Sequence, residues 1–130
     1  FKIIKDAFIH KDFSNLNFVN KEDDVAIYSR FSLHSINQKK QKIFFSNIKK
    51  LKNIKILMIE VRTVYDELYG KGKKLSKFEY FDTHYRRFLI PLDLKKIISK
   101  SFKIKYFKVS RNFAKYKNEN PKVLRIIAIR

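Results

Sequence analysis

Short apolar runs alternate with helical stripes along this chain, and this alternation restricts the folds that it can adopt. The runs at residues 25–28 and 55–59 are compact and apolar, which is typical of strands buried on both faces. Between them, large apolar residues recur at helical spacing with lysines on the opposite side. The predicted strands are residues 7–10, 25–28, 55–59, 104–110 and 123–129, and the predicted helices are residues 36–51 and 91–101.

This order of elements predicts an α/β fold in which helices cover a mostly parallel sheet, closed by an antiparallel C-terminal strand pair. The length of 130 residues limits the chain to one domain. The polar segment at residues 63–83 contains the only two glycines, Gly70 and Gly72. It is expected to be a loop or lid that bends sharply or closes over a ligand.

Composition narrows the classes of function. A net charge of +19 is typical of nucleic-acid-binding proteins, but the lysines are dispersed and accompany no arginine-rich arm or zinc-finger spacing. Because cysteine is absent, a disulfide framework and a thiolate metal site are excluded, which fits a reducing, cytoplasmic compartment. No apolar run approaches the roughly 20 residues of a membrane span.

Arginine is the rare cation in this chain, with seven arginines against twenty-four lysines. Four of the seven, Arg30, Arg62, Arg86 and Arg87, fall in three short polar blocks that follow a strand or a loop. Arginine makes fixed, multidentate contacts, whereas lysine is a solvated point charge. Ligands of open parallel sheets bind beyond the carboxyl ends of the strands, so this placement predicts a site at one rim of the sheet.

Three blocks resemble the class I S-adenosylmethionine-dependent methyltransferases, and in particular the C-terminal part of a bacterial group. They are Tyr28–Ile36, Glu60–Gly72 and His84–Phe88. The resemblance implies that residues 1–130 are the C-terminal part of one Rossmann-like methyltransferase domain. The first two strands and the glycine-rich turn would then be missing, and this piece alone would bind the cofactor poorly or not at all.

The resemblance also assigns four residues to the cofactor, S-adenosylmethionine. Asp12 would accept a hydrogen bond from the adenine amino group, and Phe13 would border the ring. Tyr28 and Ser29 leave the next strand beneath the expected position of the transferable methyl group. The alternative is that Asp12 is a surface turn residue beside a core Phe13.

Arg30, His34 and His84 are the candidate catalytic residues. An arginine after a buried strand needs a carboxylate or phosphate partner, so Arg30 either contacts the acceptor or pairs with an acid such as Glu60. His34 is a candidate general base or a substrate hydrogen bond, or else caps the following helix. His84 has the same ambiguity.

The remaining candidates are substrate-binding residues at the next strand exit, its loop and the third block. Two arginines there would clamp an anionic group bidentately, and the alternative is a salt-bridged loop anchor. These candidates are Glu60, Arg62, Asp66, Tyr69, Tyr85, Arg86 and Arg87. No set of His, Asp and Glu has metal-ligand spacing, so no metal is expected.

The expected function is therefore methyl transfer from S-adenosylmethionine to a small or carbohydrate-linked, anionic acceptor. The protein's main task in such a reaction is alignment of acceptor and methyl group. A basic RNA-binding module or an RNA methyltransferase is the alternative. A third interpretation is a non-catalytic partner that completes its sheet with another chain.

Overall fold

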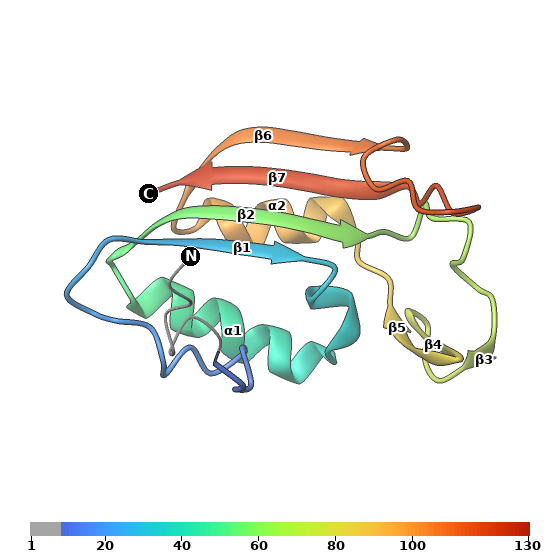
Figure 1. Cartoon of the computed structure of the whole chain (residues 1–130), viewed down its shortest axis with the longest axis horizontal. Coiled ribbons are helices and arrows are strands. Elements are labelled where there is room, and N and C mark those ends of the chain that lie inside the picture. Colours follow the sequence, from blue (N-terminus) through green and yellow to red (C-terminus); the bar gives the residue numbers. More distant parts are fainter. Residues whose placement is uncertain (1–8) are drawn as a thin grey trace, which may run out of the picture.

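The computed structural model describes residues 9–130, which form two β-sheets, two α-helices and one short 3₁₀ helix (Figure 1). The main-sheet strands are β1 (Val25–Arg30), β2 (Ile54–Arg62), β6 (Lys103–Ser110) and β7 (Val123–Ile129). The small-sheet strands are β3 (Lys73–Lys74), β4 (Glu79–Asp82) and β5 (His84–Arg87). The helices are η1 (Leu33–Ser35), α1 (Gln38–Lys50) and α2 (Pro91–Ser99).

Local chemistry accounts for the ends of the two α-helices. The side chain of Asn37 accepts a hydrogen bond from the backbone N–H of Lys40 and so caps the start of α1. Pro91 occupies the first turn of α2, where its missing N–H costs nothing. Both helices begin within two residues of the positions that the periodicity predicts.

The main sheet has the strand order β1-β2-β7-β6. The pair β1/β2 is parallel, while β2/β7 and β6/β7 are both antiparallel. The prediction of a mostly parallel Rossmann-like sheet is therefore wrong, although the C-terminal pair β6/β7 is antiparallel as expected. The strand β7 lies between β2 and β6 because its nearly continuous apolar run suits a central position, whereas the alternating lysines of β6 suit an edge.

The segment expected to be a loop instead contributes two strands to the small antiparallel sheet, which has the order β3-β4-β5. The third block of the sequence supplies β5. Both glycines have the positive φ that only glycine adopts without strain, +86° for Gly70 and +88° for Gly72. The predicted sharp bends are thus present, but they lead into a folded sheet.

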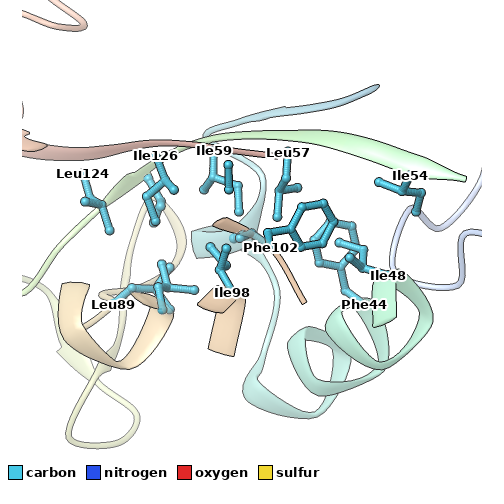
Figure 2. Packing of buried hydrophobic residues seen from close by; sticks show 14 of the residues in the cluster. Phe44, Ile48, Ile54, Leu57, Ile59, Leu89, Ile98, Phe102, Leu124 and Ile126 are labelled. Carbon is cyan, nitrogen blue, oxygen red and sulfur yellow. The ribbon is translucent and has the colours of Figure 1, made fainter. Parts of the chain in front are cut away.

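The hydrophobic core lies between the main sheet and the two helices, which cover the same face of the sheet (Figures 1 and 2). Alternate residues of the two central strands point into it, and the helices contribute Phe44, Ile48 and Ile98. The expected strand at residues 7–10 is not seen. Ala7 and Phe8 lie outside the described residues, and Ile9 and His10 are exposed and form no strand.

The opposite face of the main sheet has no helix over it among residues 9–130. One cross-strand row there is apolar, because Tyr28 pairs with Met58, Met58 with Ile127, and Ile127 with Tyr106. The two ends of this row are exposed, Tyr28 by 64% and Tyr106 by 38%. The sheet is therefore packed on one side only by the described part of the chain.

Replacing either glycine by alanine tests the turn that leads into the small sheet. A Cβ at position 72 would lie 2.6 Å from the backbone oxygen of Phe81, whereas a Cβ at position 70 would meet nothing within 4 Å. We expect Gly70→Ala to cost roughly 1 kcal/mol through its positive φ alone, and Gly72→Ala to cost roughly 2–4 kcal/mol. Urea unfolding combined with amide exchange of β3 and β4 measures the difference, and equal losses would contradict it.

Candidate functional site

A cleft opens at the carboxyl ends of β1 and β2, between the small sheet and the segment that joins β6 to β7. Its volume is about 570 Å³. Five residues predicted from the sequence line it together, although they come from three separate blocks: Arg30, His34, Arg62, His84 and Arg86. The cleft also contains Phe31, Ala114, Lys115, Tyr116, Glu119 and Pro121. The expected convergence of rare arginines and histidines is therefore present in the structure.

A buried carboxylate holds Arg30 at the edge of this cleft. Glu60 is only 2% exposed, and its Oε1 accepts a hydrogen bond from Nε of Arg30 at 3.0 Å. Its Oε2 accepts from Nη2 of Arg125 at 2.7 Å. Two guanidinium groups share one carboxylate, so this unit retains a positive charge. Because Glu60 does not line the cleft, it positions Arg30 and does not itself face a ligand.

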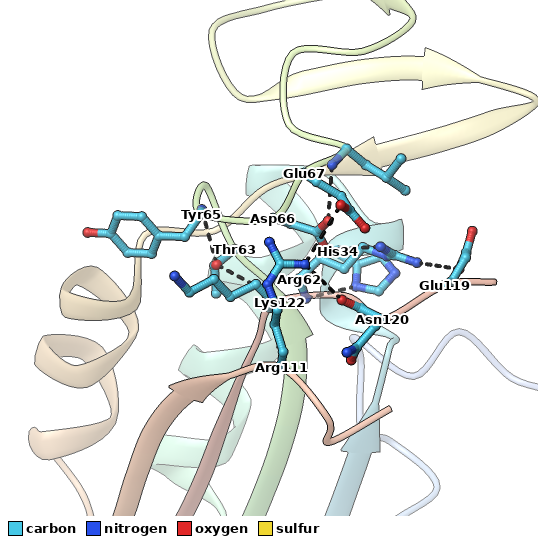
Figure 3. A network of polar contacts seen from close by, with 11 residues as sticks. His34, Arg62, Thr63, Tyr65, Asp66, Glu67, Arg111, Glu119, Asn120 and Lys122 are labelled. Carbon is cyan, nitrogen blue, oxygen red and sulfur yellow. Dashed lines mark hydrogen bonds and ion pairs between the residues drawn. The ribbon is translucent and has the colours of Figure 1, made fainter. Parts of the chain in front are cut away.

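At Arg62 the ratio of charges is opposite, because one guanidinium group pairs with two carboxylates (Figure 3). Its Nη1 donates to Asp66 at 2.9 Å and its Nη2 donates to Glu119 at 3.0 Å. Asp66 also accepts from the backbone N–H of Leu68 at 3.0 Å, is buried, and does not line the cleft. Asp66 therefore orients Arg62, while Glu119 lies within the cleft.

His34 is a buried, neutral hydrogen-bond donor in this arrangement. Its Nδ1 accepts the backbone N–H of Arg62 at 3.4 Å, so the proton of the neutral ring is on Nε2. Burial, reinforced by the positive charges of Arg62 and Arg86, lowers the pKa of His34 to about 3. The geometry favours the predicted substrate hydrogen bond over the general base, because the nitrogen left for the cleft already carries a proton.

The third block places His84 and Arg86 on the opposite wall. The backbone bends immediately before His84, where Thr83 has a φ of +58°, and the Thr83 hydroxyl lies 3.1 Å from the Nδ1 of His84. Arg86 donates to the backbone oxygen of Asp82 at 3.2 Å. Neither Arg86 nor Lys115 forms an ion pair with another residue among residues 9–130. These two cations are therefore available to a bound anion.

Three predicted substrate-binding residues lie elsewhere and have structural contacts. Arg87 is buried and donates to the backbone oxygen of Ile36 at 2.9 Å and to the side chain of Gln41, so it fastens the small sheet to the start of α1. The hydroxyl of Tyr85 donates to Glu79 at 2.6 Å, and burial raises its pKa. The ring of Tyr69 packs edge-on against Tyr80 and Phe88.

The residues predicted to hold S-adenosylmethionine do not form one site. Asp12 lies in an exposed turn, where its carboxylate accepts from the Ser14 hydroxyl at 2.7 Å and from the Lys40 ammonium at 2.9 Å. These hydrogen bonds lower its pKa to about 2, the bond from the Ser14 hydroxyl having the largest effect. Phe13 packs edge-on against Phe44 in the core. Asp12 is thus the surface turn residue of the alternative interpretation.

Phe13, Tyr28 and Ser29 do share a second, mostly apolar pocket of about 310 Å³ beside β1. The Ser29 hydroxyl is buried there without a hydrogen-bond partner among the described residues. Asp12 does not line this pocket, and among the described residues no acidic side chain does. The four predicted residues therefore do not line one pocket together.

Sequence reasoning missed one whole wall of the cleft, which comes from residues 111–122 between β6 and β7. Lys115, Tyr116 and Glu119 are its polar members. The alternation of cation and aromatic ring at residues 115–117, just before an Asn-rich turn, is the only local signal of this wall.

The charges of the cleft favour an anionic ligand. Among residues 9–130, four permanent cations line it, Arg30, Arg62, Arg86 and Lys115, against one carboxylate, that of Glu119. In residues 9–130 no group of three or more His, Asp or Glu side chains is arranged to hold a metal ion. Within the same range, neither helix has the length and apolar character needed to cross a membrane.

The neutral state of His34 predicts a pH dependence of stability. The unfolded chain binds a proton at His34 near pH 6.5, whereas the native ring does so only near pH 3. Acidification from pH 7 to pH 5 should therefore cost roughly 2 kcal/mol through this residue. His34→Asn keeps an acceptor for the Arg62 N–H but removes the titration, so its free energy of unfolding should fall less over this interval. An identical loss in urea unfolding of the two proteins would contradict this.

Comparisons with protein-family models and with curated proteins find no match to this chain. The function therefore has to be argued from the cleft and from the sequence blocks that build it.

Proposed function

We propose that the cleft binds an anionic acceptor, and that the chain provides the acceptor side of a methyl transfer from S-adenosylmethionine. The observation that carries this proposal is the convergence of Arg30, Arg62 and Arg86 from three separate blocks on one cleft. Each of these blocks is also one of the three that resemble the methyltransferases. The acceptor is a small or carbohydrate-linked molecule with a negatively charged group.

The anionic group is best placed near Arg86, Lys115 and Arg30. The first two have no carboxylate partner among the described residues, and Arg30 shares its carboxylate with Arg125. The side chain of Arg30 is about half exposed, so its guanidinium reaches the cleft while Glu60 holds its other side. His34 adds an uncharged hydrogen-bond donor, because its lowered pKa keeps the ring neutral above about pH 4.

The chemistry of the methyl donor determines what the protein has to do in this reaction. The methyl group of S-adenosylmethionine is already activated on a sulfonium, so a protein accelerates the transfer mainly by aligning the acceptor. Fixed arginines and a fixed imidazole suit that task. Because Asp12 and its predicted companions do not form one site, no donor contact is assigned to them.

Anion binding is tested by comparing two variants that each remove one positive charge. Arg86→Gln should weaken the binding of inorganic phosphate about tenfold, since it removes a cleft cation with no competing carboxylate. Lys50→Gln is the control, because Lys50 is exposed at the end of α1 and does not line the cleft. Isothermal titration at low ionic strength gives both dissociation constants. An equal loss in the two variants would show that only the net charge matters.

Methyl transfer is tested separately with labelled S-adenosylmethionine and a panel of sugar phosphates. Because this piece alone is expected to bind the cofactor poorly, we expect only slow labelling of the product by the unchanged chain at high cofactor concentration. Labelling by Arg86→Gln should be slower still, because a misplaced acceptor loses alignment. Phosphate binding without any transfer would leave the anion cleft standing and overturn the methyltransferase proposal.

Salt dependence separates the small anionic acceptor from the RNA alternative, which the net charge of +19 favours. RNA binding that neutralises many phosphates should weaken steeply between about 50 and 200 mM salt. A single anionic group in the cleft should show a shallow dependence. A steep dependence with RNA that is unaffected by Arg86→Gln would place function on the lysine-rich surface instead.

A further inference from the structure

We propose that Glu119 determines the specificity of the cleft by occupying the outer face of Arg62 in place of the ligand's anionic group. A ligand then has to displace Glu119 to reach Arg62. This inference rests on the proposed function only in taking the cleft as an anion site.

The two carboxylates on Arg62 differ in how firmly they are held. The side chain of Asp66 is fully buried and that of Glu119 is 56% exposed. Asp66 is fixed twice, by Nη1 of Arg62 and by the backbone N–H of Leu68. The Glu119 carboxylate has a single partner within residues 9–130, Nη2 of Arg62 at 3.0 Å. Because more than half of the Glu119 side chain is exposed, its ion pair with the buried Arg62 contributes less free energy than the fully buried Asp66 pair, so the outer carboxylate is the displaceable one.

Glu119 lies inside the cleft, where an anionic group of a ligand would lie, and not outside it like Glu60 and Asp66. Within the described part of the chain it contributes the only carboxylate that lines the cleft, where it faces cations from three blocks. Figure 3 shows it approaching Arg62 from the segment between β6 and β7, on the side away from Asp66. Arg62 thus has one guanidinium nitrogen committed to the protein and one whose partner is exchangeable.

The wall that carries Glu119 also supplies an aromatic ring. Glu119 and Tyr116 exchange two backbone hydrogen bonds, at 3.0 and 2.9 Å, so one turn holds both residues. Tyr116 lines the cleft and its ring is largely exposed. A ligand that takes Nη2 of Arg62 therefore lies close to an aromatic side chain.

This arrangement selects for strongly charged ligands. A monocarboxylate offers Arg62 no more than Glu119 already does, so exchange brings no net gain there. A dianionic phosphate monoester brings more charge and more acceptor oxygens to the arginines of the same cleft. We therefore infer that the ligand is a phosphate monoester and that Glu119 discriminates against simple carboxylates.

The test uses three variants of the chain, titrated with inorganic phosphate and with acetate. Glu119→Gln should tighten phosphate binding about fivefold and acetate binding by more than that, so that the selectivity for phosphate falls, and equal tightening of both would contradict the inferred discrimination. Glu119→Asp keeps the charge but is one methylene shorter and should also tighten binding. Glu67→Gln is the matched control, because Glu67 is an exposed, arginine-paired carboxylate that does not line the cleft.

The outcomes separate this inference from the function on which it rests. If Glu119→Gln and Glu67→Gln have equal effects while Glu119→Asp behaves like the unchanged chain, only net charge matters and the inference is overturned. If phosphate binds, Arg86→Gln weakens it and Glu119→Gln leaves it unchanged, the inference fails while the anion cleft stands. If neither the unchanged chain nor Glu119→Gln binds phosphate, both are overturned.

Discussion

The cleft end of the main sheet depends on the ion pairs that the buried carboxylate of Glu60 forms. This carboxylate lies on the central strand β2 and receives guanidinium groups from β1 on one side and β7 on the other. A carboxylate this deeply buried is costly unless both of its oxygens are paired, and here both are. The same contacts tie together three strands and aim Arg30 at the cleft. Loss of either arginine partner would leave a buried charge partly uncompensated.

The convergence of the site was predictable because it follows from local rules. β1 and β2 are parallel, so the polar residues that follow Tyr28 and Ile59 emerge at the same edge of the sheet. The scarcity of arginine made those exits conspicuous in the sequence. The extents of α1, α2 and β7 were also predictable, since each has a clear periodicity or a proline or asparagine at its start.

The rest depends on tertiary contacts that the local pattern does not contain. The pattern of residues 123–129 does not indicate that this strand lies between β2 and β6. The strands of the small sheet are short and polar, so their sequence resembles that of a loop. Arg86 and Arg87 are adjacent and chemically identical, yet one faces the cleft and the other is buried against Ile36 and Gln41. Asp12 was assigned to the cofactor by resemblance, but its carboxylate accepts a hydrogen bond from Ser14 within its own turn.

One face of the main sheet has no helix over it among residues 9–130, and this gives the positive charge of the lysines a second role. Tyrosine, methionine and isoleucine side chains form a continuous row there, and such a surface attracts another like it. With a net charge of +19, two copies repel each other before those rows can meet. Salt screens this electrostatic repulsion, and the range of the repulsion falls from about 10 Å at 0.1 M salt to about 3 Å at 1 M. Any self-association through this face would therefore depend on the salt concentration.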